Sequence, residues 1–414
     1  MNFPTFAIVP AGGCGQRAGV DIPKQYCDVL GRPLIVYTLE VFQRLVWVEK
    51  IFVAISPDWE AHARELVLSY HLSKVELING GSSRHHSIQN CVQHLQNHLL
   101  KRREGAELGK QNGKVLAEEE PIVIIQDAVR PFADENILRK VTLAAKEHRA
   151  SGSVLPLVST ILESDSQDVL VQSLVRSKLR ESHTPQAFWW STLREAYQKI
   201  TDYDLIHGTE VLDLALKYTG CRAKLVEAPD YVWKVTYKKD FLAAETLAKV
   251  HNSEVYLLSS DPVTNKVLMT LQSCLVSRNL KVSVVPTLPD SVKSFHTSIF
   301  LHLVKPAEEE ATTKCEETLN ALHLVSRPGH SGLLACMCHL HDGSDRTLGF
   351  YRRLARSLDT QGKAKKVQAF LVVYTTPKDE EQQTISKVCE MLAGLILDRN
   401  PQMSGQLFVI SDQD

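Results

Sequence analysis

The chain has 414 residues, 44% of them hydrophobic and 23% charged, which is typical of soluble globular proteins and enough for two domains. The formal net charge is -1, so neither nucleic acid nor a membrane surface is expected as the main partner. No apolar run approaches the roughly 20 residues of a membrane span, and residues 6–9 are too short for a signal peptide. The nine cysteines follow no pairing pattern, so we expect reduced thiols and a cytosolic location.

Short apolar runs alternate with helical patterns through residues 1–250. This rhythm predicts a largely parallel sheet with helices on both faces, the architecture of an α/β domain. Ligands of such sheets bind beyond the carboxyl ends of the strands. We expect strands at residues 6–10, 51–56, 75–79, 122–126, 153–158 and 223–227, and helices at 34–44, 85–100 and 137–148.

Two segments interrupt this alternation. Residues 101–120 are charged, contain glycine and have little apolar content, so we expect a flexible surface insert there. Residues from about 158 to 182 carry strand-like pieces but no long helical period. We expect this second segment to form an arm that leaves the sheet and packs on a second subunit.

A second alternation predicts a smaller α/β domain over residues 251–414. It contains no Walker-type loop and no GxGxxG pattern, so no nucleotide and no role is assigned to it. Cys336 and Cys338, close to His339 and His341, hint at a metal site, although packing explains the cysteines equally well. We expect strands at residues 255–259, 282–285, 300–304, 332–336, 369–374 and 407–410, and helices at 263–277, 309–324, 348–358 and 380–398.

The strongest chemical signal is the segment PAGGCGQR at residues 10–17, directly after the first strand. Its glycines allow a tight turn that presents backbone N–H groups to an anion, and Arg17 adds forked donors. Lys24, in the segment PKQY at residues 23–26, offers a compact charge to a second phosphate. The spacing matches neither a Walker loop nor the dinucleotide fingerprint, and a plain tight connection is the alternative interpretation.

A second signal is Asp127, in the segment QDAVRP at residues 126–131. It follows a predicted central strand, which is where a Mg²⁺ ligand is expected in an α/β sheet. A helix cap, or an ion pair with Arg130, would explain the same residue without any ligand.

Three further segments carry polar side chains near predicted strand ends. GGSSRHHS at residues 80–87 offers donors for a base or ribose, or simply a helix cap. Arg176 and the segment TPQ at residues 184–186 lie near the predicted arm. Asp230 and Lys234 follow the last strand of the first domain, where a solvated ion pair is the alternative.

These five motifs, in this order and spacing, resemble the 2-C-methyl-D-erythritol 4-phosphate cytidylyltransferase family and its ribitol-5-phosphate branch over about residues 6–249. The resemblance implies a Rossmann-like nucleotidyltransferase domain that joins the CMP part of CTP to D-ribitol 5-phosphate, giving CDP-ribitol and pyrophosphate. It implies further that Mg²⁺ is the cofactor, that the enzyme is a homodimer, and that CDP-ribitol supplies O-mannosyl glycosylation of dystroglycan.

The resemblance also implies roles for individual residues. The expected catalytic residues are Arg17, Lys24 and Lys234, and Asp127 and Asp230 are expected near Mg²⁺. Ser82 stands where many family members carry an acidic residue, so contacts to cytosine can differ there. CTP would be bound by Ala11, Gly12, Gly13, Gly15, Gly81, Ser82, Arg84 and Ser87, and the acceptor phosphate by Arg130, Thr160, Arg176 and Thr184, partly from a partner subunit.

Charge explains why this reaction needs cations more than a base. A phosphate monoester has a second pKa of about 6 and is mostly a dianion at neutral pH, so no proton has to be removed from it. His85, His86 and His183 are therefore not expected to be catalytic. Three alternatives stay open: an enzyme using UTP or GTP on a sugar 1-phosphate, a cytidylyltransferase acting on methylerythritol 4-phosphate or another pentose or pentitol phosphate, and a non-catalytic scaffold.

Overall fold

In this computed structural model the chain forms two compact units, Met1–Ala244 and Glu245–Asp414, and each is considered by itself. The division falls inside helix α8 (Lys238–His251), shortly before the predicted boundary after residue 250. No helix in the described part of the chain is long and apolar enough to cross a membrane. The structure describes residues 1–13, 22–108, 119–251, 253–258, 266–278, 280–289, 296–304, 306–325, 331–340, 344–375 and 381–410.

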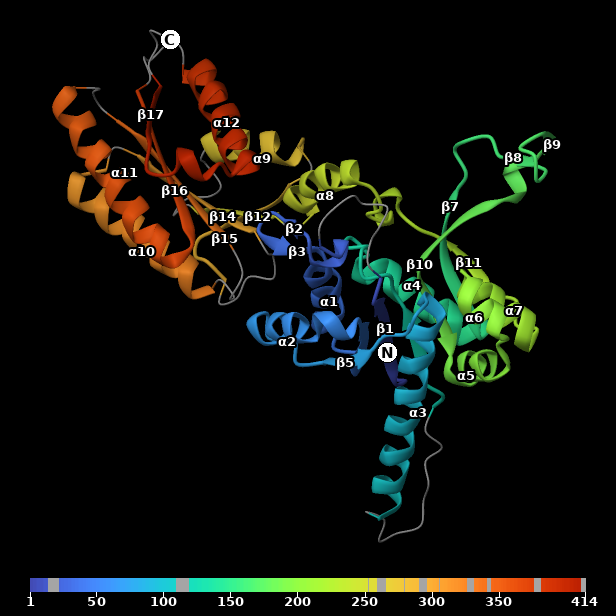
Figure 1. The fold of residues 1–414 in the computed structure, drawn as a ribbon. Coiled ribbons are helices and arrows are strands. Elements are labelled where there is room, and N and C mark those ends of the chain that lie inside the picture. The colour runs from blue at the N-terminus through green and yellow to red at the C-terminus, as the bar shows by residue number, and fades with distance from the viewer. Residues whose placement is uncertain are drawn as a thin grey trace. The chain divides into compact units, whose positions relative to one another are not determined.

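The first unit is built on a seven-stranded sheet in the order β11-β7-β10-β6-β1-β4-β5 (Figure 1). The central strand β1 pairs in parallel with β4 and β6, whereas β10 runs antiparallel to both β6 and β7. The strands are β1 (Thr5–Ala11), β4 (Lys50–Ile55), β5 (Val75–Asn79), β6 (Ile122–Ile125), β7 (Ala150–Pro156), β10 (Arg180–Trp189) and β11 (Lys224–Glu227). The sequence predicted all of these except β10, because the beginning of that strand, RESHTPQ, is polar and shows no apolar alternation.

Helices cover both faces of this sheet, as the alternation of strand and helix patterns predicted. The segment Ile122–Ile125 is fully buried, which is expected of a strand packed on both sides. One face packs against α1 (Leu34–Arg44), α2 (Glu60–Ser69) and α4 (Glu135–His148), and the other against α3 (Arg84–Leu108), α5 (Trp190–Lys199) and α7 (Val211–Thr219), with α6 (Asp202–His207) against α3.

The two interruptions take different forms. The predicted loop at residues 101–120 is wrong at its beginning, because α3 continues to Leu108; the lysine, arginine and glutamate residues there are good helix formers. Residues 109–118 lie outside the described part of the chain. The arm contains β8 (Leu162–Ser164) and β9 (Leu170–Ser173), which pair with each other apart from the main sheet, and it stands out from the unit in Figure 1.

The second unit is an α/β layer structure of its own, as predicted. Its six described strands pair in parallel, in the order β13-β12-β14-β15-β16-β17. The strands are β12 (Ser253–Leu258), β13 (Lys281–Val285), β14 (His296–Val304), β15 (Ser331–His339), β16 (Val367–Tyr374) and β17 (Leu407–Ile410). One face carries α9 (Lys266–Val276) and α12 (Glu381–Asp398), the other α10 (Glu308–Val325) and α11 (Asp345–Lys365).

The cysteines that hinted at a metal in this unit are core residues. Cys336 and Cys338 lie on β15 and are fully buried in the apolar layer that faces α10 and α11. A hydrogen bond with Cys315 and burial raise the pKa of Cys336 well above the usual thiol value, so the thiol stays protonated. The described residues contain no group of three potential metal ligands, and His341 lies outside them. Packing therefore accounts for both cysteines.

Candidate active site

A cavity of about 530 Å³ lies in the first unit, where β1 and β6 end and α3 begins. This is the edge of an α/β sheet at which ligands are expected to bind. Four of the five sequence motifs contribute to one lining, although they are far apart along the chain. The lining consists of residues 10–13, 24–25, 81–84, 87, 127–129 and 234.

The first glycine-rich segment begins where β1 ends at Ala11. A buried side chain, Gln25, holds it in place: Nε2 of Gln25 donates to the carbonyl oxygens of Ala11 at 2.6 Å and Gly13 at 2.9 Å. Gln25 lies in the short 3-10 helix η2 (Lys24–Tyr26), next to Lys24. Sequence reasoning gave this residue no role, although it stands inside the PKQY segment. Gly15, predicted to bind CTP, and Arg17, predicted to be catalytic, lie outside the described residues.

The second glycine-rich segment forms the turn into α3. A Cβ atom on Gly81 would lie 2.3 Å from Cβ of His86, so only glycine fits there, and its N–H donates to Oγ of Ser87 at 3.1 Å. Oγ of Ser83 accepts from the N–H of His86 at 3.0 Å and so caps the helix. The helix-cap interpretation of this segment is therefore right for Ser83. It leaves Arg84 in the first turn of α3, facing the cavity.

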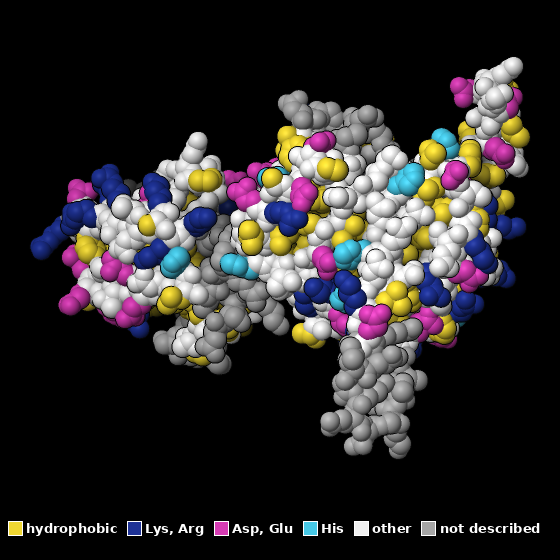
Figure 2. Space-filling model, turned by 60° about the horizontal axis from the view of Figure 1, so that its bottom comes forward, with side chains coloured by type: hydrophobic (Ala, Val, Ile, Leu, Met, Phe, Trp, Pro, Cys, Tyr) yellow, Lys and Arg dark blue, Asp and Glu magenta, His cyan; other side chains and the backbone are white. Residues whose placement is uncertain are grey.

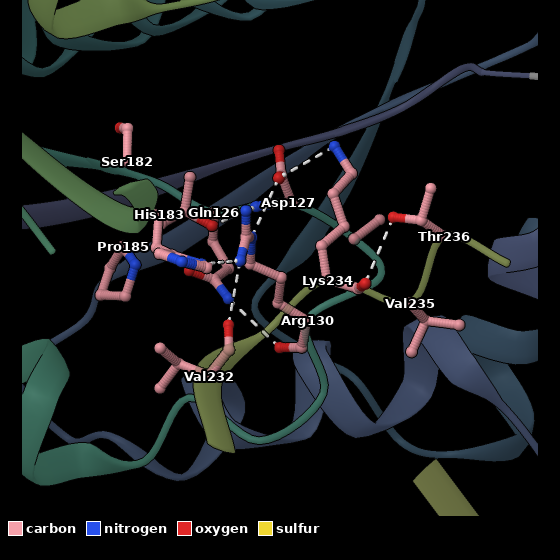
Figure 3. Close-up of polar contacts among 12 residues, drawn as sticks. Gln126, Asp127, Arg130, Ser182, His183, Pro185, Val232, Lys234, Val235 and Thr236 are labelled. Atoms are coloured by element: carbon pink, nitrogen blue, oxygen red, sulfur yellow. Dashed lines mark hydrogen bonds and ion pairs between the residues drawn. The ribbon is translucent and has the colours of Figure 1, made fainter. Parts of the chain in front are cut away.

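Asp127 is the centre of an ionic cluster at this cavity (Figure 3). Its Oδ2 lies 3.1 Å from both Nε of Arg130 and Nζ of Lys234, the two partners labelled in Figure 3. Its Oδ1 lies 3.2 Å from Nη2 of Arg84. Burial alone would raise the pKa of Asp127, but the three cations outweigh it and hold that pKa well below its usual range. The carboxylate therefore stays ionised and holds cations from three separate segments together.

The segment that carries Lys234 is fixed by backbone hydrogen bonds. It follows the short 3-10 helix η5 (Asp230–Val232), and the N–H of Val235 donates to the carbonyl oxygen of Val129 at 3.0 Å. Nζ of Lys24 in turn donates to the carbonyl oxygen of Val235 at 3.0 Å. These bonds bring the ammonium groups of Lys24 and Lys234 to the same cavity, as the sequence predicted.

The two residues predicted near Mg²⁺ differ in position. Mg²⁺ in nucleotide sites is usually held by one or two carboxylates together with substrate phosphates. Asp127 supplies one carboxylate at the cavity and fits this role, whereas Asp230 is exposed and is not among the lining residues. The described residues hold no cluster of three potential metal ligands. Mg²⁺ binding, and the part of Asp230 in it, stay predictions.

The four residues predicted to bind the acceptor phosphate fall into two pairs. Arg130 and Thr184 are buried behind Asp127, where Oγ1 of Thr184 accepts from the N–H of Asp127 at 3.1 Å. Thr160 and Arg176 are exposed on the arm, and Arg176 donates to the carbonyl oxygen of Val158. None of the four lines the cavity of its own chain. The predicted role of Thr160 and Arg176 is taken up in the partner-subunit arrangement proposed below, and direct binding of the acceptor by Arg130 and Thr184 stays a prediction.

The histidines next to these motifs form structural contacts. His85 is fully buried, and its Nδ1 lies 2.8 Å from the hydroxyl of Tyr197. Burial, followed by the charge of Arg84, lowers the pKa of His85 to about 4. His86 contacts Ser82 through Nδ1 at 2.9 Å. For both residues the polar contact is with a neighbouring protein group.

Comparison with known proteins shows the family to which the chain is similar. A family model described as 2-C-methyl-D-erythritol 4-phosphate cytidylyltransferase matches residues 5–102 and 104–249. The chain is 34% identical to D-ribitol-5-phosphate cytidylyltransferase of Mus musculus, over 97% of this chain and 90% of that protein. It is 36% identical to the Xenopus tropicalis protein of the same name, over 97% of each, and 44% identical to that of Homo sapiens, over 60% of this chain and 52% of the human protein. The crystal structure of Francisella tularensis 2-C-methyl-D-erythritol 4-phosphate cytidylyltransferase is 24% identical, covers 58% of this chain and 98% of that one, and has a TM-score of 0.45.

Proposed function

The chain belongs to the 2-C-methyl-D-erythritol 4-phosphate cytidylyltransferase family, and from this membership we propose that it converts CTP and D-ribitol 5-phosphate to CDP-ribitol and pyrophosphate. The name of the relatives that match over 97% of the chain supports ribitol 5-phosphate as the acceptor. The observation that carries the proposal is the convergence of Lys24, Arg84 and Lys234 on one cavity around the ionised Asp127.

The reaction brings together two strongly anionic molecules. An oxygen of the acceptor phosphate dianion attacks the α-phosphorus of CTP, a new P–O bond forms, the bond from the α-phosphorus to the bridging oxygen breaks, and pyrophosphate leaves with that electron pair. Lys24 and Lys234 place positive charge where negative charge accumulates, so the barrier from repulsion falls. Alignment of the two substrates in the cavity supplies the rest.

The ionic cluster prepares this site for a triphosphate. The side chains of Lys234 and Arg84 are 33% and 25% exposed, so each can exchange an oxygen of Asp127 for an oxygen of a phosphate. Asp127 would then be available to a metal ion. Mg²⁺, when bound with CTP, would be held by Asp127 and the phosphates and would supply further charge neutralisation.

The arm supports a homodimer in which each chain completes the site of the other. Its apolar side chains at residues 158, 162, 169, 170, 171 and 175 are each more than half exposed, and Figure 2 shows such side chains, in yellow, along the arm. Burial of these side chains on a second copy would be favourable and would bring Thr160 and Arg176 to the acceptor side of the partner's cavity. Light scattering should give twice the chain mass, and Leu170→Asp should give a monomer with reduced activity. A fully active monomer would contradict the proposal.

The proposed reaction is tested by measuring pyrophosphate release with Mg²⁺ and a panel of substrates. CTP should be used in preference to UTP, GTP and ATP, and ribitol 5-phosphate in preference to methylerythritol 4-phosphate and ribose 5-phosphate. A preference for UTP or GTP with a sugar 1-phosphate would replace the proposal by the first alternative above. Absence of turnover with every pair would leave the non-catalytic scaffold.

We further propose, from the family resemblance, that the enzyme works in the cytosol and supplies CDP-ribitol for O-mannosyl glycosylation of dystroglycan. Cells that lack the enzyme should lose CDP-ribitol and the glycans that contain ribitol phosphate. Expression of the wild-type chain should restore both, whereas a Lys24→Ala chain should not. Unchanged CDP-ribitol in the deficient cells would contradict this role.

A further inference from the structure

The antiparallel strand β10 delivers a histidine to the back of the ionic cluster. Gln186 is the first residue of β10 to pair with β6, opposite Ile125, and the pairing with β7 is irregular between Ser182 and Gln186. A break of this kind redirects side chains out of the regular ladder. His183 lies within the break, is 4% exposed, and contacts the guanidinium of Arg130 through Nδ1 (Figure 3).

The chemistry of the two groups fixes the state of this imidazole. A guanidinium can only donate hydrogen bonds, so Nδ1 of His183 has to be the acceptor and the ring proton has to be on Nε2. Nε2 lies 3.2 Å from Oε1 of Glu181, an electrostatic contact that favours a proton on this nitrogen although its geometry is not that of a hydrogen bond. Burial and the neighbouring Arg130 lower the pKa of His183, which agrees with a neutral ring.

Arg130 in turn contacts two groups next to the cavity, Asp127 and the segment that carries Lys234. Its Nε contacts Oδ2 of Asp127 at 3.1 Å, and its Nη1 donates to the carbonyl oxygen of Val232 at 3.0 Å, two residues before Lys234. The contact with His183 therefore fixes the rotation of a side chain that holds both the central carboxylate and the segment of a proposed catalytic lysine. Arg130 and His183 themselves are not among the residues that line the cavity.

We infer that His183 is a positioning residue: as the neutral Nε2–H tautomer it orients Arg130, and through Arg130 it orients Asp127 and the segment of Lys234. This inference rests on the proposed cytidylyl transfer, since the groups it orients act in that reaction. It assigns Arg130 to the support of the site, in contrast to direct binding of the acceptor phosphate. It assigns no proton transfer to His183.

A pair of variants separates orientation from bulk packing. His183→Leu removes the acceptor for Arg130, whereas His183→Asn keeps an acceptor oxygen near the position of Nδ1. We expect His183→Leu to lower kcat by about 10-fold to 100-fold, the range for loss of a hydrogen bond to a charged group. We expect His183→Asn to stay within about threefold of wild type, and KM for CTP and for the acceptor to change little in either variant.

Two outcomes would overturn the inference. Equal loss of kcat in His183→Leu and His183→Asn would show that ring packing matters and the acceptor does not. A rise in acceptor KM at unchanged kcat would show that Arg130 binds the acceptor phosphate directly.

A spectroscopic measurement tests the contact between His183 and Arg130 separately from the proposed function. In protein labelled with ¹⁵N-histidine, the resonances of His183 are identified by their absence from the spectrum of His183→Asn. Nδ1 should be unprotonated and Nε2 protonated, and the opposite tautomer would overturn the inference even in a fully active enzyme. If the wild-type chain shows no cytidylyl transfer while this tautomer is found, the proposed function fails and the contact with Arg130 stands.

Discussion

Both units of the chain are built on a sheet with helices on its two faces, but different side chains lie at the carboxyl ends of the strands. At the carboxyl ends of β1 and β6, the first unit gathers a carboxylate and three cations around a cavity. At the carboxyl ends of β15 and β16, the second unit carries His339 and Tyr374, whose rings stack with centroids 4.7 Å apart. His302 on β14 lies beside them, with Nε2 3.2 Å from the hydroxyl of Tyr374.

The comparison teaches that the sheet provides the position of a site and the side chains provide its chemistry. In a fully parallel sheet, every strand has its carboxyl end at the same edge, and no strand begins there. The first unit adds an antiparallel strand, β10, whose beginning reaches the same edge and places His183 and Thr184 behind Asp127. The charged cluster thus depends on an element that the second unit lacks among its described strands.

The largest expected difference between the two units is the effect of a lysine substitution on kcat. Lys24→Ala takes away a cation that lines the cavity, and we expect kcat to fall by about 10²-fold to 10³-fold, as when one electrostatic stabiliser is removed. The matched control is Lys363→Ala in the second unit, which removes an exposed lysine from its ion pair with the partly buried Asp359 and should leave kcat unchanged. Pyrophosphate release at saturating substrates measures both. Near-normal turnover of Lys24→Ala would refute its role.

Neutralising a carboxylate should lower the unfolding free energy more in the first unit than in the second. Asp127→Asn leaves three cations without their partner, and we expect the first unit to lose about 3 kcal/mol of unfolding free energy, at the low end for a buried pair because two of the cations are partly exposed. Asp359→Asn, which loses one exposed lysine, should cost less than about 1 kcal/mol. All five tryptophans lie in the first unit, so their emission during urea unfolding reports that unit, and far-UV circular dichroism follows both. Equal small losses would contradict the central role of Asp127.

Acid should act on both units through one histidine in each, the buried His85 in the first unit and the partly buried His302 in the second. Burial, followed by the charge of Arg84, lowers the pKa of His85 to about 4. Burial, followed by His339, lowers the pKa of His302 to about 4 as well. In the unfolded chain both pKa values are near 6.5. The unfolded chain binds more protons between these values, so the stabilising contribution is complete above pH 6.5 and is lost as the pH falls to 4. For His85 the loss is at most about 3 kcal/mol.

The measurement is the pH dependence of urea unfolding. His85→Asn should flatten the pH dependence seen by tryptophan emission, and His302→Asn should leave that signal unaffected while flattening the remaining change in circular dichroism. An unchanged slope in His85→Asn would show that His85 titrates alike in both states.

The smallest expected effect is the change of KM for CTP at Gln25. Its control is Gln368, which makes the same type of hydrogen bond in the second unit. Gln25 donates to carbonyl oxygens of the glycine-rich segment, and Gln368 donates to the carbonyl oxygen of Arg399 in the second unit at 3.1 Å. We expect Gln25→Ala to raise KM for CTP about fivefold, the effect of about 1 kcal/mol, because the segment loses its support. Gln368→Ala should leave KM unchanged. A rise of equal size in both variants would point to general destabilisation.

Much of the fold was predictable because buried strands have continuous apolar runs. The segment Ile122–Ile125 is such a run, and its position directly before Asp127 located the site at a strand end. Strand β10 was missed for the opposite reason, since its first residues are polar and make their contacts at the site. The error hid the fact that Thr184 belongs to the central sheet.

The motifs themselves were predictable, but the pairing of their side chains was not. Spacing along the chain indicated that Asp127 and Lys234 share a sheet edge, and the structure places them 3.1 Å apart. The roles of Gln25 and His183 depend on which backbone carbonyl or guanidinium lies opposite, which requires three-dimensional coordinates. A polar residue that supports a site looks like any other polar residue in a sequence.

The arm has a pharmacological consequence through its connection to β10. The strand that begins at Arg180, where the arm ends, continues three residues later into His183, so the arm and the ionic cluster share one backbone. Small molecules aimed at the nucleotide cavity have to be highly charged, which hinders their entry into cells. In the proposed homodimer the hydrophobic side chains of the arm are covered by the partner subunit, so an apolar compound that competes for them would inhibit by keeping the two chains apart, without resembling a nucleotide.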